Sequence, residues 1–128
     1  MPAVAFSKGV RMSPRKVSVV AALVRGRSVS DALTILDHTP RRPAESVKKT
    51  VLSAKANAEH NHSYKPDSLF ISQITVTAGP RYRRYRAAAR GRALRYARQT
   101  SHIKVVVEGD KREVKKKTAE KIESMEKS

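Results

Sequence analysis

Apolar residues in the first half of the chain recur at spacings of three and four, which predicts helices with one buried face. The first of these helices follows Ser13-Pro14, where Ser13 is the expected N-cap and Pro14 takes the first helical position. It ends at Arg25-Gly26, because glycine readily adopts the left-handed conformation that often follows a helix. The apolar positions inside it are Val17, Val20, Ala21 and Val24.

Two further helices are expected before residue 63. The second begins at an N-cap on Ser30 and stops at Thr39-Pro40. The third begins at that same dipeptide, with Thr39 as its cap and Pro40 in its first position, and its pattern fades at Asn61-His62. Its apolar stripe contains many small residues, which predicts close packing: Ala44, Val47, Val51, Ala54 and Ala58.

Three segments have the composition of β-strands. Residues 4–12 alternate loosely and are interrupted by Gly9. Residues 69–78 are rich in β-branched side chains with imperfect alternation, which favours a partly buried and bulged strand. Residues 102–107 alternate regularly and place Ile103, Val105 and Val107 on one face.

The stretch between the last two strands, residues 79–101, has no periodicity that could form a core. If the flanking strands pair antiparallel, the midpoint falls near Arg90-Gly91, so Gly91 is the expected tip of a long hairpin. Arms of about a dozen residues would reach ~40 Å at ~3.3 Å per residue. Isolated two-stranded ribbons are marginally stable in water, so we expect this tip to be mobile until a partner holds it.

Positive charge is distributed unevenly along the chain. The chain has 128 residues and a formal charge of +17. Residues 1–30 contain six basic residues and residues 68–107 contain nine, with no acidic residue in either segment, whereas segments 31–67 and 108–128 are nearly balanced. Such a localised excess is typical of a protein that binds a polyanion, either a nucleic acid or an anionic membrane surface.

Several classes of function are excluded by composition. Without cysteine the chain has no disulfide, no thiol catalysis and no cysteine-ligated zinc. Its apolar runs are far shorter than the roughly 18 to 20 residues that span a bilayer. Residues 1–10 lack the apolar core of a secretory signal. We therefore expect a cytoplasmic location and no membrane partner.

The histidines His60, His62 and His102 are the candidates for a metal site, so a metal-dependent nuclease is one alternative. No second histidine pair completes a four-ligand set, and Glu59 and Asp67 are the only carboxylates nearby. Glycine-rich loops of the Walker or dinucleotide-binding type do not occur. We expect no metal, no cofactor and no catalytic residue.

Arginine and tyrosine dominate the expected hairpin, in which every basic residue up to Ser101 is arginine. Guanidinium groups bind phosphate in a bidentate manner and stack on bases, while tyrosine rings offer a stacking surface for unpaired nucleotides. The alternative, a solvated charge run, usually mixes both signs and both basic residue types. The residues in question are Arg81, Tyr82, Arg83, Arg84, Tyr85, Arg86, Arg90, Arg92, Arg95, Tyr96 and Arg98.

A second basic cluster flanks the first helix and consists of Arg11, Arg15, Lys16, Arg25 and Arg27. We expect RNA contact here as well, although basic residues in a last helical turn also complement the helix dipole. The short turn between the first two helices is similar to a helix-turn-helix, so a free DNA- or RNA-binding regulator is the rival interpretation. A recognition helix should carry basic residues, however, and residues 31–38 contain neither lysine nor arginine.

The order of motifs resembles the family of bacterial large-subunit ribosomal protein twenty-two from about residue 10 to residue 107. The most specific segments are Asn57-Ala58-Glu59-His60-Asn61 and Arg90-Gly91-Arg92. The other matching segments are Ser13-Pro14-Arg15-Lys16-Val17, Val24-Arg25-Gly26-Arg27, Ala32-Leu33, Thr39-Pro40, Ser53-Ala54, Gly79-Pro80 and Thr100-Ser101-His102-Ile103.

This resemblance implies an α+β fold in which three helices pack on a small three-stranded antiparallel sheet and a long β-hairpin protrudes. We expect one domain over residues 1–107, with the hairpin at 79–103, and a charged tail at 108–128 that is a frayed helix or disordered. The resemblance also implies a non-enzymatic constituent of the large ribosomal subunit, monomeric within the ribosome. It would bind 23S-type rRNA and neighbouring ribosomal proteins, aid subunit assembly, and line the nascent-peptide exit tunnel with its hairpin.

Site residues follow from the basic clusters and the resemblance together. The expected rRNA-binding residues are Arg11, Arg15, Lys16, Arg25, Arg27, His60, Asn61, Arg81, Arg83, Arg84, Arg86, Arg90, Arg92, Arg95, Arg98 and His102. The expected tunnel-lining tip comprises Tyr82, Arg83, Arg84, Tyr85, Arg86, Ala87, Ala88, Ala89, Arg90, Gly91 and Arg92. The resemblance associates Tyr82, Arg83 and Arg84 with macrolide response. Ala87-Ala88 stand where the family usually has proline followed by a basic residue, so this tip is less stiff and less charged.

Overall fold

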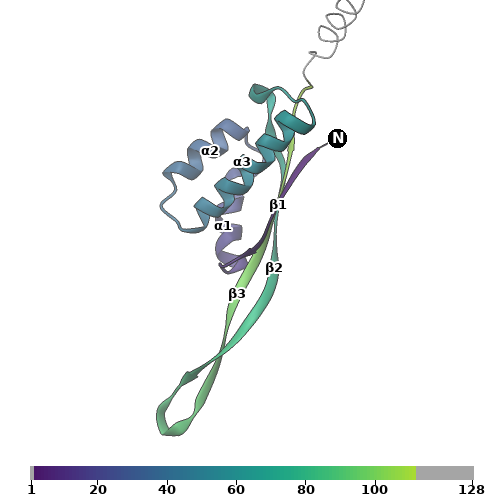
Figure 1. The fold of residues 1–128 in the computed structure, drawn as a ribbon. Coiled ribbons are helices and arrows are strands. Elements are labelled where there is room, and N and C mark those ends of the chain that lie inside the picture. The colour runs from purple at the N-terminus through teal and green to yellow at the C-terminus, as the bar shows by residue number, and fades with distance from the viewer. Residues whose placement is uncertain (1, 112–128) are drawn as a thin grey trace, which may run out of the picture.

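The computed structural model describes residues 2–111, which form three helices and a three-stranded antiparallel sheet with the strand order β1-β3-β2. The strands are β1 (Ala3–Val10), β2 (Phe70–Ala87) and β3 (Ala93–Glu108), and the helices are α1 (Pro14–Val24), α2 (Val29–His38) and α3 (Pro43–Asn61). β3 is the central strand although it comes last, because it pairs with β1 on one side and β2 on the other. Figure 1 shows β2 and β3 continuing far beyond the helices, which confirms the expected α+β fold.

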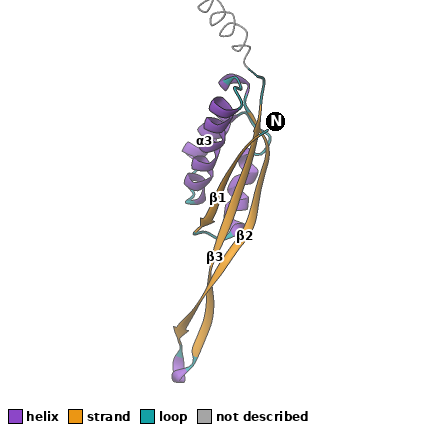
Figure 2. Cartoon of the chain, turned by 45° about the vertical axis from the view of Figure 1, so that its right-hand side comes forward, coloured by secondary structure: helices purple, strands orange, loops and turns teal. Residues whose placement is uncertain are grey.

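The helices cover one face of the sheet. α3 lies against β1 and β3, and α1 lies against β2. Ile103, Val105 and Val107 are fully buried, as their alternation predicts, whereas Phe6 on the opposite face is 61% exposed. The small-residue stripe of α3 is buried along its whole length, which allows that helix to approach the strands closely. Figure 2 shows the sheet nearly edge-on with α3 beside it.

α2 begins two residues earlier than its sequence pattern predicts. The N-cap is Ser28, whose Oγ accepts a hydrogen bond from the Asp31 amide, and the expected cap Ser30 lies inside the helix. The reason is tertiary: Ser28 forms a β-bridge with Phe70, and the Val29 amide donates to the Leu69 carbonyl. This pairing fixes the start of α2 on the edge of β2.

α3 begins three residues later than predicted from a cap at Thr39. The structure places Arg42 at the N-cap and Pro43 at the first helical position, so Pro40 lies outside the helix. Thr39 completes α2 instead, because its amide donates to the Leu36 carbonyl and its hydroxyl to the Ile35 carbonyl. The end of α3 at Asn61 agrees with the prediction.

The hairpin forms from the outer halves of β2 and β3. Its last strand pair is Ala87 with Ala93, and the turn contains Arg90 at φ 61° and Gly91 at φ 70°, which confirms the predicted tip. The predicted bulging of β2 is also present, since the register shifts between Ile71 and Gln73 and again between Ala78 and Arg81. The free two-stranded part covers residues 81–99, because Ser101 and Ile103 of the expected hairpin still pair with β1.

Residues 108–111, at the start of the predicted tail, make contacts with the rest of the fold. Glu108 ends β3, Lys111 forms a bridge with Tyr64, and the Lys65 amide donates to the Asp110 carbonyl. The remainder of the predicted tail lies outside the described residues.

Candidate nucleic-acid interface

The hairpin has two different faces, because cross-strand partners project to the same side of a sheet. The first face pairs Tyr82 with Arg98, Arg84 with Tyr96, and Arg86 with Leu94. The second pairs Arg81 with Gln99, Arg83 with Ala97, and Tyr85 with Arg95. Tyrosine and arginine therefore alternate over the first two pairs of the first face, which carries two tyrosines where the second face carries one.

Tyr96 organises two of the arginines on the first face. The guanidinium carbon of Arg86 lies 5.2 Å from the centre of the Tyr96 ring, and that of Arg98 lies 5.4 Å from it. A cation–π contact holds a guanidinium group in place without neutralising its charge. Arg86 and Arg98 are thus positioned and still available to an anion.

No arginine among residues 2–111 forms a salt bridge with an acidic residue. The salt bridges within residues 2–111 join Lys48 to Asp37, Lys49 to Glu45 and Lys55 to Glu59. All of them belong to the nearly balanced segment 31–67, and none involves an arginine. The structure therefore keeps the positive charge of the two acid-free segments uncompensated.

The cluster predicted around α1 divides into two groups. Arg27 donates from Nε to the Leu23 carbonyl at 3.1 Å in the last turn of α1, and Arg25 donates from Nη2 to the Ile74 carbonyl of β2 at 3.1 Å, which joins the end of that helix to the sheet. Arg11 and Lys16 lie at the other end of α1 and line an open groove of about 540 Å³. Arg15 is exposed beside them.

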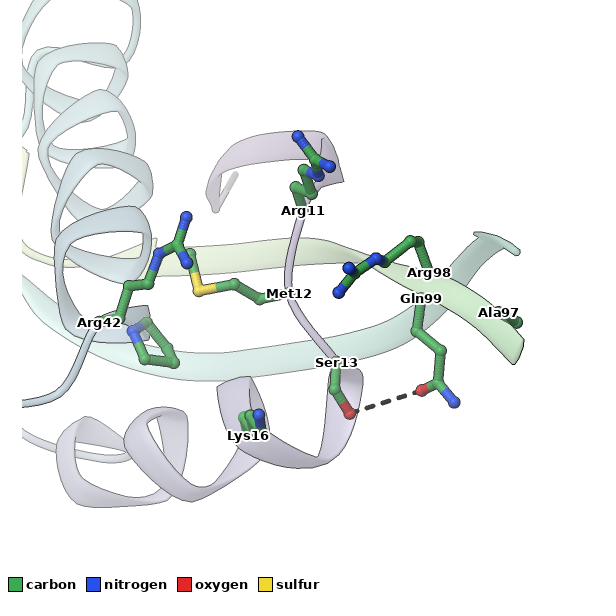
Figure 3. A pocket seen from close by; sticks show the side chains of 9 residues that line it. Arg11, Met12, Ser13, Lys16, Arg42, Ala97, Arg98 and Gln99 are labelled. Carbon is green, nitrogen blue, oxygen red and sulfur yellow. Dashed lines mark hydrogen bonds between the residues drawn. The ribbon is translucent and has the colours of Figure 1, made fainter. Parts of the chain in front are cut away.

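This groove contains a cation that sequence patterns did not single out. Figure 3 shows Arg42 on one side of the connection from β1 to α1 and Arg98, a hairpin residue, on the other. Arg42 was missed because it lies in the nearly balanced segment, where its charge cancels in the sum. Its position directly before Pro43 was the available signal, since that proline marks a helix start.

None of the histidines lines the groove. His60 and Asn61 are exposed at the far end of α3, near the N-terminus of the chain in Figure 1. His102 accepts a hydrogen bond at Nδ1 from the Gly9 amide at 3.1 Å, which helps to join β1 to β3 at the β1 bulge. The His62 ring stacks on Tyr64. Within residues 2–111 no three His, Asp or Glu side chains are close enough to share a metal ion.

The helix-turn-helix interpretation requires α2 to be a basic recognition helix, and the structure does not support that role. α2 buries Val29, Ala32 and Leu36 and carries no lysine or arginine.

Of the helices that the structure describes, none is sufficiently long and apolar to cross a membrane.

Comparison with known proteins agrees with this fold and charge distribution. The family model described as Ribosomal protein L22p/L17e matches residues 5–108. The large ribosomal subunit protein uL22 of Oceanobacillus iheyensis is 49% identical over 107 residues, which cover 84% of this chain and 95% of that protein. The uL22 proteins of Herpetosiphon aurantiacus (45% over 108 residues, 84% and 96% covered) and Clostridioides difficile (47% over 111 residues, 87% and 100% covered) are similar. The chain therefore belongs to the Ribosomal protein L22p/L17e family of large-subunit ribosomal proteins.

Proposed function

We propose that this chain anchors itself in large-subunit rRNA through its two acid-free segments and lines the nascent-peptide exit tunnel with its hairpin. As a family member it is a structural constituent of the large ribosomal subunit, located in the ribosome of the bacterial cytoplasm, and not an enzyme. Its partners in this proposal are rRNA, neighbouring ribosomal proteins and the nascent peptide, and it acts as a monomer within the ribosome.

The observation that carries the proposal is the exposed Arg/Tyr hairpin without acidic partners. Residues 81–95 expose nearly every side chain, and Tyr82 and Tyr85 are 51% and 67% exposed. Like charges on paired strands repel one another, so an unliganded hairpin of this kind gains little from its own contacts. An RNA surface would supply phosphates for the guanidinium groups and bases for the rings.

The first test concerns rRNA binding. If about six phosphates are neutralised, the slope of log K against log salt concentration should be about −4 to −5. Filter binding of large-subunit rRNA across a salt series measures that slope, and a slope near −1 would contradict the proposal. Sequence-specific footprinting of a duplex DNA site at physiological salt would favour the rival regulator.

The second test separates assembly from tunnel lining. Replacing residues 82–98 by Asn-Gly joins Arg81 to its cross-strand partner Gln99 through a two-residue turn that suits an antiparallel pair. We expect this shortened chain to enter large subunits in cells that lack the full-length protein, since the groove residues other than Arg98 remain. Failure to enter would assign the main rRNA anchor to the hairpin.

Tunnel lining itself is tested by photo-crosslinking. Benzoylphenylalanine replaces either Tyr85 on the hairpin or Phe6 on the sheet, two exposed aromatic positions. Translating ribosomes that carry a radiolabelled nascent chain should cross-link to it from position 85 and not from position 6. Equal labelling from both positions, or none from position 85, would contradict a tunnel-facing hairpin.

A further inference from the structure

The groove at the base of the hairpin is built from four separate parts of the chain. Arg11 belongs to the connection after β1, Lys16 to α1, Arg42 to the start of α3, and Arg98 to β3. Figure 3 shows the Arg98 side chain extending toward the β1–α1 connection, with Met12 extending toward Arg42 from the same connection. No acidic residue lines the groove.

Four cations around one open hollow are unfavourable in the absence of an anion. None of the four takes part in a salt bridge within residues 2–111, although acidic residues are available on α2 and α3. The same helices pair three lysines with carboxylates. The groove thus keeps its charge, and a guanidinium-rich hollow of this kind suits phosphate oxygens, which accept bidentate hydrogen bonds.

A neighbouring hollow indicates which class of phosphate-containing ligand fits the groove. It shares Arg11 and Arg98 with the groove and is also lined by Tyr82 and Tyr96 of the first hairpin face. The groove itself has no aromatic side chain and offers only Met12, Pro43 and Ala97 as apolar surface. One site therefore offers cations and the adjoining site offers rings, which is the pattern that a nucleic-acid strand requires for its backbone and an unstacked base.

We propose that the groove lined by Arg11, Lys16, Arg42 and Arg98 binds a backbone phosphate of single-stranded RNA, and that the next base stacks against Tyr82 or Tyr96. This inference rests on the proposed function and deepens it by assigning a defined phosphate site. Because three of the cations belong to the domain and one to the hairpin, the bound phosphate also fixes the direction in which the hairpin leaves the domain.

The chain provides a matched control for each of two groove residues. Arg42 and Lys16 line the groove, whereas the exposed residues Arg41 and Lys65 do not line it. The variants Arg42→Gln and Lys16→Gln are therefore compared with Arg41→Gln and Lys65→Gln, which change the net charge equally. The probe is hexauridylate, and binding to the full-length chain is followed by fluorescence anisotropy at several salt concentrations.

We expect the two groove variants to weaken hexauridylate binding about three- to tenfold and each to reduce the salt slope by about 0.7. The two control variants should change the affinity by less than about twofold. Met12 provides a local reporter, because its methyl resonance in a chain with labelled methionine should shift on addition of hexauridylate. Circular dichroism establishes that every variant is folded, and Lys16→Gln tests the same groove if Arg42→Gln perturbs α3.

Equal effects of groove and control variants, with an unshifted Met12 methyl, would overturn the groove site. If the wild-type chain still bound rRNA with a steep salt slope, the proposed function would stand without it. Inorganic phosphate alone should also shift the Met12 methyl resonance. At least one of the variants Tyr82→Leu and Tyr96→Leu should weaken hexauridylate binding while preserving this phosphate-induced shift. Unchanged hexauridylate binding by Tyr82→Leu and by Tyr96→Leu would overturn the stacking part.

Discussion

Gly79 lies where β2 leaves the three-stranded sheet, and its missing side chain makes room for Thr100 of β3. A β-carbon at position 79 would lie 2.5 Å from the Thr100 hydroxyl oxygen and 3.2 Å from the His102 ring. That hydroxyl donates to the Pro80 carbonyl at 2.7 Å, and Thr100 is 4% exposed. A single hydrogen atom at this position therefore permits the bulge from which the hairpin starts.

We expect Gly79→Ala to lower the free energy of unfolding by about 1 to 3 kcal/mol, because the added methyl displaces a buried hydroxyl from its acceptor. Urea denaturation of the full-length chain measures the change. The control is a double-mutant cycle with Thr100→Ala, in which the hydroxyl that clashes is absent. A cost of Gly79→Ala that is as large in the Thr100→Ala background would contradict the proposed clash.

At the scale of elements, the two ends of α2 are fixed by different kinds of contact. Its start depends on the pairing of Ser28 and Val29 with the beginning of β2. Its end depends on local hydrogen bonds from Thr39 back to Ile35 and Leu36. Ser28 and Ser30 are both serines near a helix start, so only the fold decides which of them is the cap.

Replacement of each serine in turn tests this assignment. Ser28→Ala should cost about 1 kcal/mol of stability, because the Asp31 amide loses its side-chain acceptor. Ser30→Ala should change stability by less than about 0.5 kcal/mol, since alanine is the better helix former inside a helix. Chemical denaturation under identical conditions measures both, and a larger effect at Ser30 would show that the cap lies there.

At the scale of the whole molecule, the hairpin lies outside the apolar core. The apolar core described by the structure draws on β1, the helices and the inner halves of β2 and β3, and includes no residue between 77 and 102. The hairpin beyond the bulge is exposed and carries much of the charge excess. The apolar core and the basic hairpin therefore occupy different lengths of the same two strands.

In the shortened chain, Asn-Gly replaces residues 82–98. Its free energy of unfolding, measured in urea, should therefore equal that of the full-length chain within about 1 kcal/mol. At low ionic strength it should gain stability relative to the full-length chain, because several uncompensated arginines are removed. Denaturation at low and high salt measures both effects. A loss of more than about 2 kcal/mol would mean that the hairpin contributes to the core.

Much of the fold followed from local patterns. Helical spacing identified the buried residues of α1 and α3, and alternation identified Ile103, Val105 and Val107. The tip at Arg90-Gly91 followed from the midpoint between two strand patterns. The same holds for the acid-free Arg/Tyr hairpin, since charge and aromatic content are properties of a contiguous segment.

Local patterns could not place residues that are distant in sequence. The start of α2 at Ser28 depends on Phe70, and the use of Arg25 inside the fold depends on the Ile74 carbonyl.

The groove is the clearest case, because Arg11, Lys16, Arg42 and Arg98 line one groove only in a fold where β3 pairs with β1 and α3 packs on both. Periodicity and charge therefore determined which segments form helices, strands and a basic hairpin. Long-range strand pairing and helix packing decided which cations line the same groove, since proximity between distant residues is created only by folding.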